Sequence, residues 1–118
     1  MPFEPGQLLL VSFPFTDRTT AKLRPALVVS GAEFKRGDDF VAVPLSSRPR
    51  DDVYDFPITS SMPFFKQSGL KQDSIVKWSK PMTISTAVAH RKLGRIPDEV
   101  MFEINKLIRS LFPVAPES

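Results

Sequence analysis

Residues 22–30, Lys22-Leu23-Arg24-Pro25-Ala26-Leu27-Val28-Val29-Ser30, form the most informative stretch of the chain. The segment Ala26–Ser30 is mostly apolar and partly β-branched, which predicts a short buried strand. Pro25 has no N–H for a strand ladder, so we expect it at the first position of this strand or on a sheet edge. Its ring also forces Arg24 into extended backbone. The guanidinium is therefore held at the mouth of a strand, where it either grips a phosphate through two hydrogen bonds or simply begins the strand at the surface.

Outward from this stretch, short apolar segments broken by prolines predict further strands. They are Gln7–Phe13, Phe40–Pro44 and segments around Tyr54–Ile58, Asp73–Trp78 and Met82–Ser85. Residues 59–69 are predicted to form a loop with buried aromatic anchors, and Thr86–His90 a helical turn. The sequence thus predicts one mainly β domain over residues 1–118, with five to seven short antiparallel strands in a strongly curved sheet and one helix against it.

The last element predicted is an amphipathic helix that begins after Pro97. Its apolar residues recur at helical spacing: Val100, Met101, Ile104, Leu107, Ile108 and Leu111. Acidic residues occupy its first turn and basic residues its last, as the helix dipole favours. Phe102 falls on the opposite side from the apolar stripe, so we expect it to be exposed or to contact a partner.

The composition excludes several kinds of chemistry. The 118 residues include no cysteine and a single histidine, His90, so a disulfide framework, a histidine metal cage and a two-histidine ribonuclease mechanism are excluded. There is no long apolar run for a membrane span and no leader pattern. The sequence therefore predicts a cytoplasmic protein without membrane association.

Basic residues are concentrated in one part of the chain, although the net charge is only +3. Between Lys71 and Arg95 there are six basic residues and one acid, Asp73. Such an excess attracts a polyanion such as nucleic acid, or an acidic peptide. It is equally typical of a plain solvated face.

The polar residues of the loops suit phosphodiester recognition. Gly-rich phosphate loops and metalloprotease motifs are missing from the sequence. Carboxylates are few in the segments that we assign to a site, which disfavours a two-metal nuclease. What remains is a set of hydroxyl and cationic groups: Thr16, Thr19, Arg24, Ser46, Ser47, Arg48 and Lys77. A guanidinium stabilises charge developing on a phosphorane, and RNA supplies its own 2′-hydroxyl nucleophile, so no metal or other cofactor is needed. The residues alone leave open an RNA-cleaving enzyme and a plain binding module.

The order of short motifs resembles the PemK/MazF family of toxins from type II toxin–antitoxin systems. The motifs are Gly6 followed by an apolar strand ending in Phe13-Pro14, then Arg24-Pro25-Ala26-Leu27-Val28-Val29, Pro44-Leu45-Ser46-Ser47, Gly69-Leu70, Asp73-Ser74-Ile75-Val76, Thr83-Ile84-Ser85 and Leu93-Gly94. They span residues 6–112 when the C-terminal helix is included. No single motif is specific, but their order is.

This resemblance implies a compact SH3-like barrel, usually a homodimer, that cleaves single-stranded RNA without metal and leaves a 2′,3′-cyclic phosphate. It also implies a cognate acidic antitoxin, with which the toxin binds DNA in autoregulation. Arg24 matches the family's catalytic arginine, and Ser46 stands in place of the family's threonine, which positions the phosphate. From their residue types we expect Thr16, Thr19, Ser47, Arg48 and Lys77 to bind the substrate. The alternative is a non-cleaving protein of this fold that binds gyrase, or only RNA or the antitoxin.

Two residues depart from the family pattern because Ser79 and Ser85 stand where some members carry acids. A mechanism that uses either acid is not available to this chain. Of the remaining conspicuous residues, we expect Asp73 to hold the loop before a strand and Trp78 to pack in the core or a dimer interface. His90 lies outside every matched catalytic position, so we expect it to be structural.

Overall fold

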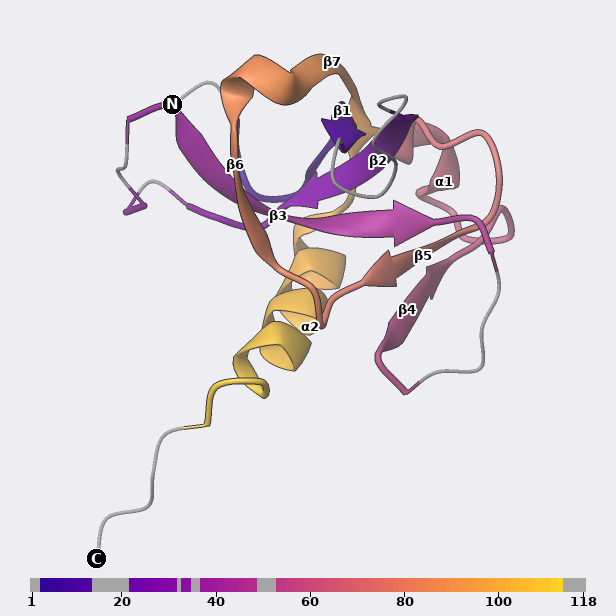
Figure 1. Cartoon of the computed structure of the whole chain (residues 1–118). Coiled ribbons are helices and arrows are strands. Elements are labelled where there is room, and N and C mark those ends of the chain that lie inside the picture. The colour runs from indigo at the N-terminus through magenta and orange to yellow at the C-terminus, as the bar shows by residue number, and fades with distance from the viewer. Residues whose placement is uncertain (1–2, 14–21, 32, 35–36, 49–52, 114–118) are drawn as a thin grey trace, which may run out of the picture.

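The computed structural model describes residues 3–13, 22–31, 33–34, 37–48 and 53–113. Over these residues the chain forms a curled sheet of seven strands with helices at its sides (Figure 1). In chain order the elements are β1 (Gln7–Phe13), β2 (Lys22–Val28), β3 (Asp39–Ser46), β4 (Asp55–Ile58), α1 (Phe65–Ser68), β5 (Ser74–Lys77), β6 (Met82–Ser85), the 3-10 turn η1 (Thr86–Val88), β7 (Ala89–Arg95) and α2 (Asp98–Arg109).

The strand β3 connects the two parts of the sheet. The strand order is β4-β5-β3-β2-β1-β7, with β6 also paired to β3, and every pair is antiparallel. Residues 39–42 of β3 pair with β6, residues 42–44 with β2, and Leu45 and Ser46 with β5. One strand therefore contacts three others, which bends the sheet into the predicted barrel-like form.

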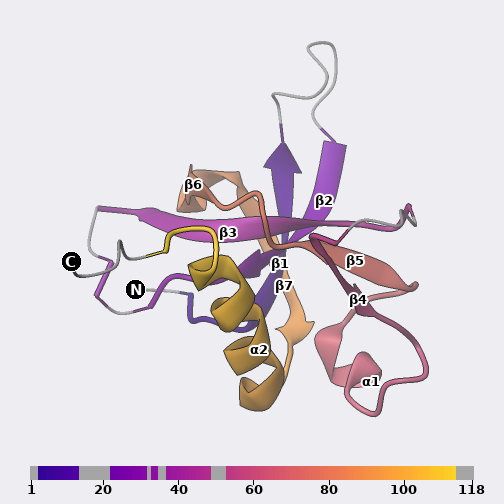
Figure 2. The same ribbon diagram turned by 90° about the horizontal axis from the view of Figure 1, so that it is seen from below.

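Both faces of the sheet are buried. Successive residues of a strand point to opposite faces, so Leu8 of β1 packs in a cluster with Ile104 of α2, whereas Leu9 packs in a second cluster with Phe40. The first cluster lies between the sheet and α2, which crosses beneath it (Figure 2). The second is closed by the curl of the sheet, where Ile84 of β6 packs against it. Burial on both faces explains why the central runs of β1, β2 and β3 are almost continuously apolar.

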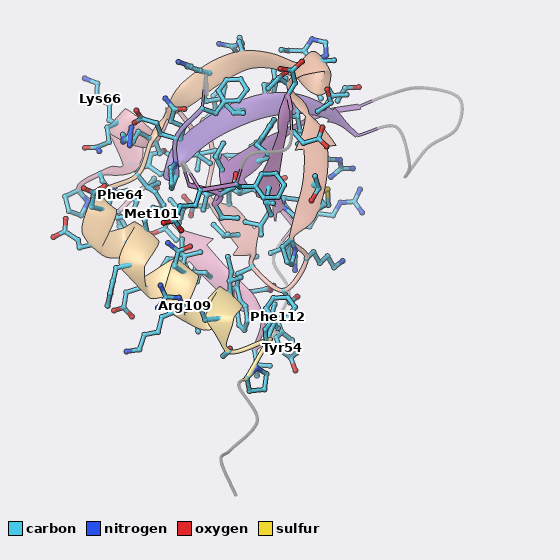
Figure 3. All side chains as sticks on the ribbon, turned by 90° about the vertical axis from the view of Figure 1, so that its left-hand side faces the viewer. Tyr54, Phe64, Lys66, Met101, Arg109 and Phe112 are labelled. Carbon is cyan, nitrogen blue, oxygen red and sulfur yellow. The ribbon has the colours of Figure 1, made fainter. Side chains whose placement is uncertain are left out.

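The helix α2 begins where the sequence predicts and turns its apolar stripe to the core, but it ends at Arg109, so Leu111 of the predicted stripe lies beyond it. Met101, labelled on α2 in Figure 3, is buried, and so is Ile104. Phe102 is 65% exposed. Asp98 begins the helix after Pro97, as the sequence indicates.

The predicted strands are confirmed at β1, β4, β5 and β6, whereas β2 and β3 differ from the prediction at their ends. β2 begins at Lys22, so Pro25 lies inside the strand rather than at its first position. It is tolerated there because pairing with β3 begins only at Ala26, which leaves the start of β2 without a neighbour on that side. β3 continues past Pro44 to Ser46, because its last two residues pair with β5 instead of β2.

Two elements, α1 and β7, were not predicted from the sequence. Residues 59–69 contain the short helix α1, and the segment after η1 is the strand β7. β7 carries the polar run His90-Arg91-Lys92, which has no apolar alternation to indicate a strand. Its pairing with the buried strand β1, interrupted by two register shifts, holds it in extended form. The helical turn predicted at Thr86–His90 is confined to η1.

Two glycines allow α1 and β7 to touch through their backbones. Gly69 ends α1 with a left-handed φ of 76°, and a Cβ added there would lie 2.0 Å from the carbonyl oxygen of Leu93. A Cβ on Gly94 would lie 2.2 Å from the carbonyl oxygen of Gln67. Only glycine fits at either position, so this contact, the Gly69–Gly94 crossing, fixes the loop after α1 against β7.

Candidate active site

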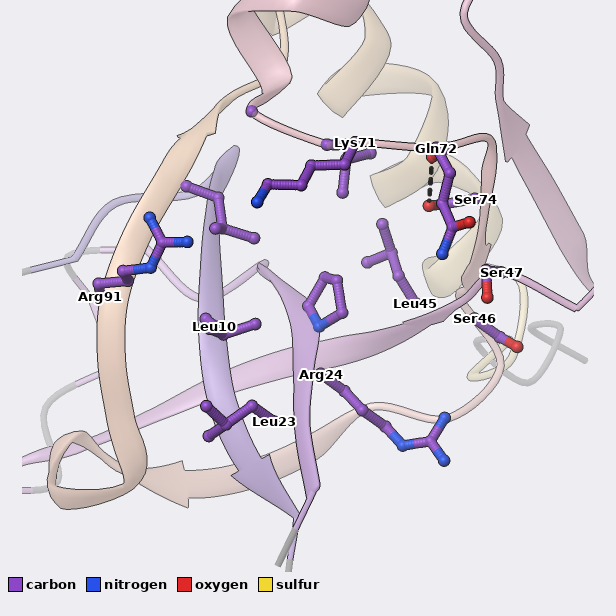
Figure 4. Close-up of a pocket in the computed structure, with 14 residues that line it drawn as sticks. Leu10, Leu23, Arg24, Leu45, Ser46, Ser47, Lys71, Gln72, Ser74 and Arg91 are labelled. Carbon is purple, nitrogen blue, oxygen red and sulfur yellow. Dashed lines mark hydrogen bonds between the residues drawn. The ribbon is translucent and has the colours of Figure 1, made fainter.

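A pocket of about 410 Å³ opens where β2, β3, β7 and the loop after α1 meet (Figure 4). Aliphatic side chains form much of its lining: Leu10, Leu23, Pro25, Leu45, Leu70 and Leu93. Polar and cationic residues complete it: Arg24, Ser46, Ser47, Lys71, Gln72, Ser74 and Arg91. Among the described residues that line it there is no carboxylate and no histidine. The pocket therefore offers cations and hydroxyls around an apolar surface.

Arg24 enters this pocket from β2, where it is paired with Val11 of β1 and precedes the first residue paired with β3. Its Nε atom is buried and has no hydrogen-bond partner among the residues that the structure describes. A buried donor without an acceptor costs about 1–3 kcal/mol, more if charged. An anion bound in the pocket would offset this free-energy cost if one of its oxygens accepted a hydrogen bond from Arg24.

Ser46 ends β3 with its hydroxyl already oriented. Its Oγ accepts a hydrogen bond of 3.2 Å from the backbone N–H of Arg48. The hydroxyl hydrogen stays available to donate to a ligand, since a serine Oγ accepts and donates at once. In Figure 4 the Arg24 side chain extends toward the side of the pocket that holds Ser46 and Ser47. The structure thus brings three of the predicted site residues together.

Two further predicted site residues, Arg48 and Lys77, do not line the pocket. Arg48 is exposed, and its backbone, not its side chain, holds Ser46. Lys77 donates to Asp55 Oδ1 at 2.7 Å, in an ion pair whose side chains are only 15% and 7% exposed. Substrate binding by these two residues stays a prediction. Thr16 and Thr19 lie outside the described residues.

Asp73 and Trp78 are structural as expected, whereas the structural role expected of His90 stays a prediction. The Asp73 carboxylate accepts a 2.7 Å hydrogen bond from the backbone N–H of Ser60, which ties down the loop before β5. Trp78 is 5% exposed and packs its ring against Tyr54. His90 is exposed on β7, away from the pocket lining.

Four polar residues of the pocket were not predicted as site residues from the sequence: Lys71, Gln72, Ser74 and Arg91. The basic excess between Lys71 and Arg95 was the available signal, but it did not distinguish a binding face from a solvated one. The deciding feature is the Gly69–Gly94 crossing, which places two distant basic segments on one pocket. Glycine pairs that meet in space leave no periodic pattern in a sequence.

Elsewhere in the described part of the chain, no group of three or more histidine or carboxylate side chains is placed to hold a metal ion. No helix in that part is long and apolar enough to cross a membrane.

The curled sheet and its pocket define a class of protein: a small antiparallel β-barrel domain whose pocket is lined by a partly buried arginine, Arg24, and by the hydroxyl of Ser46 at the end of a strand. The chain belongs to the family described as PemK-like, MazF-like toxin of type II toxin–antitoxin system, whose profile matches residues 4–112. The family resemblance of the motifs is thereby confirmed.

Solved structures of similar fold agree with this assignment. A MazE–MazF structure (Form-II) from Deinococcus radiodurans is 21% identical, with a TM-score of 0.73 over 94% of this chain and 96% of that one. The Mycobacterium tuberculosis toxin MazF-mt6 is 17% identical, with a TM-score of 0.64 over 90% and 95% of the two chains. A mycobacterial endoribonuclease in complex with its cognate antitoxin is 21% identical, with a TM-score of 0.69 over 96% and 99%. No curated protein sequence matches this chain.

Proposed function

We propose that the protein is an endoribonuclease that cleaves single-stranded RNA with selectivity for sequence and without a metal ion, and that a cognate acidic antitoxin inhibits it. The observation that carries the proposal is the buried, unpartnered Nε of Arg24 in a pocket shared with the Ser46 hydroxyl. Family membership supports the same activity.

In the proposed reaction the 2′-oxygen of the RNA attacks the adjacent phosphorus and the bond from phosphorus to the 5′-oxygen breaks. The 2′-hydroxyl gives up one proton to solvent and the leaving 5′-oxygen takes one up, so the products are a 2′,3′-cyclic phosphate and a 5′-hydroxyl. Arg24 donates to the non-bridging oxygens on which charge develops, and Ser46 donates a further hydrogen bond. Arg24 does not act as a base, because guanidinium is not deprotonated in proteins.

The partners follow from the same chemistry. The pocket carries three cations that form no ion pair among the described residues, Arg24, Lys71 and Arg91. They would attract the RNA backbone, and equally the carboxylates of an acidic antitoxin segment. One solved structure of this fold is titled as an endoribonuclease with its cognate antitoxin. We propose the same kind of partner here, with a homodimer as the working state.

Cleavage of single-stranded RNA is expected to continue in excess EDTA, since the mechanism uses cations of the protein in place of a metal. The measurement is gel analysis of a mixed RNA pool, with product ends identified as cyclic phosphates by mass spectrometry. Adding the antitoxin should stop it. RNA that stays intact while DNA gyrase is inhibited would instead establish the non-cleaving alternative.

Removing the Ser46 hydroxyl is expected to lower the cleavage rate roughly 10- to 100-fold, because a hydrogen bond to a charged group contributes about 1.5–3 kcal/mol. Ser46→Ala tests this loss, and Ser46→Thr is the matched control. Threonine keeps the hydroxyl and stiffens its rotamer, so Ser46→Thr should retain at least the original rate. Equal rates for Ser46→Ala and the unchanged protein would remove Ser46 from the mechanism.

A further inference from the structure

We propose that Lys71 and Arg91 form a second phosphate site, which binds the RNA phosphate next to the one that is cleaved. This inference rests on the proposed ribonuclease function and adds residues to it. It makes the substrate a strand with at least two consecutive phosphates, held at two points of the same pocket.

The two cations share the pocket with Arg24 and Ser46 but approach it from another wall. Figure 4 shows the Lys71 side chain extending from the loop after α1 across the pocket, toward Arg91 on β7. Arg24 instead extends toward the side that holds Ser46. The pocket therefore has cations at separate places, as a nucleic-acid backbone with repeated charges requires.

The Gly69–Gly94 crossing holds Lys71 and Arg91 in this relation. Lys71 follows Gly69 by two residues, and Arg91 precedes Leu93 by two residues. Because Gly69 packs directly on the backbone of Leu93, neither segment can move away from the other without breaking the contact. The backbone positions of Lys71 and Arg91 are thus fixed relative to each other, although both side chains are exposed.

Nothing in the described part of the chain neutralises these two charges. The ion pairs there join Lys77 to Asp55 and Arg95 to Glu4. Two cations directed at the same space repel each other, and an anion between them converts that repulsion into attraction. A phosphate fits this role, since it presents several acceptor oxygens to both donors.

The surface between the two cationic places is aliphatic and includes Leu10 and Leu45. A ribose or the face of a base can lie on such a surface while its two flanking phosphates reach the cations. The pocket volume of about 410 Å³ is of the size that holds a small ligand. The arrangement fits one nucleotide unit with a phosphate at each side.

The test measures binding of a 2′-O-methyl oligonucleotide of mixed sequence, about twelve nucleotides long, which lies within the usual site size for a single strand. It cannot be cleaved, because it lacks the 2′-hydroxyl. We expect the double variant Lys71→Gln/Arg91→Gln to reduce the magnitude of the slope of log affinity against log salt by about 0.7, which is the value for one phosphate contact with a single strand. Binding at 0.1 M salt should weaken about fivefold.

The matched control is Lys106→Gln/Arg109→Gln, which removes the same two charges from the exposed last turn of α2. Its salt slope should equal that of the unchanged protein. The proposal is overturned if the pocket variant behaves like this control or like the unchanged protein. Circular dichroism establishes that both variants are folded.

A second measurement identifies which phosphate of the RNA is bound by Lys71 and Arg91. Two versions of an RNA that the protein cleaves are compared with the unmodified RNA. In one version the phosphate on the 5′ side of the cleaved phosphate is replaced by a neutral methylphosphonate, and in the other version the phosphate on its 3′ side is replaced. If Lys71 and Arg91 bind one of these two phosphates, its replacement and the double variant should not have additive effects on cleavage. Additive losses on both sides would overturn the assignment. Failure of cleavage as such contradicts the proposed function, whereas an unchanged salt slope contradicts only the second site.

Discussion

Replacing Arg24 by lysine is expected to lower the rate constant for RNA cleavage roughly 10²- to 10³-fold, nearly as much as replacing it by alanine. Lysine keeps the positive charge but loses the planar fork that donates to two oxygens at once. The Nε of Arg24, buried and without a partner, is one of the donors that lysine cannot supply. The measurement is single-turnover cleavage of one RNA by the three proteins.

The folding stability of a further variant, Arg24→Met, separates the role of Arg24 in catalysis from its role in the fold. Arg24→Met removes a buried donor that has no partner, so urea unfolding should show no loss and a gain of up to about 1 kcal/mol. Arg109→Ala, on an exposed part of α2, is the control for removing one arginine charge and should cleave at the original rate. If Arg24→Lys were fully active, the guanidinium would act only through its charge and the proposed bidentate contact would be wrong.

Replacing Gly94 by alanine is expected to destabilise the protein by about 3 kcal/mol or more, at the upper end of overpacking effects. The new methyl group would meet the carbonyl oxygen of Gln67 at 2.2 Å and the carbonyl carbon of Ser68 at 2.5 Å. Both are backbone atoms, so α1 must move away from β7 as a unit. The measurement is the midpoint of urea unfolding.

Two other glycines provide controls for this effect. Gly31→Ala places a methyl group no closer than 4.0 Å to Pro5, so its stability should change little. Gly37 has a φ of 58° and nothing within 4 Å of an added Cβ, so Gly37→Ala should cost only the left-handed backbone strain, about 1–2 kcal/mol. If Gly94→Ala unfolds at the same urea concentration as Gly31→Ala, the backbones do not meet as described.

The sequence predicted those elements whose pattern is local. The apolar runs of β1 and β5 and the helical spacing of α2 are visible within a few residues, and the structure confirms them. β7 could not be predicted, because its polar residues become a strand only by pairing with β1. The same applies to α1, a single turn that is held by its contact with β7.

The candidate site was predictable to a similar extent. Arg24 and Ser46 stand in short motifs, and adjacent strands bring them to one pocket. Lys71 and Arg91 were visible only as part of a basic excess, because a charge in a sequence does not indicate which charges will face it. Lys77 belonged to the same excess, yet it lies outside the pocket lining and forms an ion pair with Asp55. This pair could not be predicted, because the two residues become neighbours only when β4 pairs with β5.

The pairing of β1 with β7 also orders events during synthesis on the ribosome. Gln7–Phe13 emerges early, but its partner Ala89–Arg95 emerges only when most of the chain has been translated. Contacts between such distant segments form slowly, because the intervening chain must first be ordered. Arg91 and Leu93 of this late segment line the pocket, so the pocket cannot be complete before residues 89–95 have been synthesised.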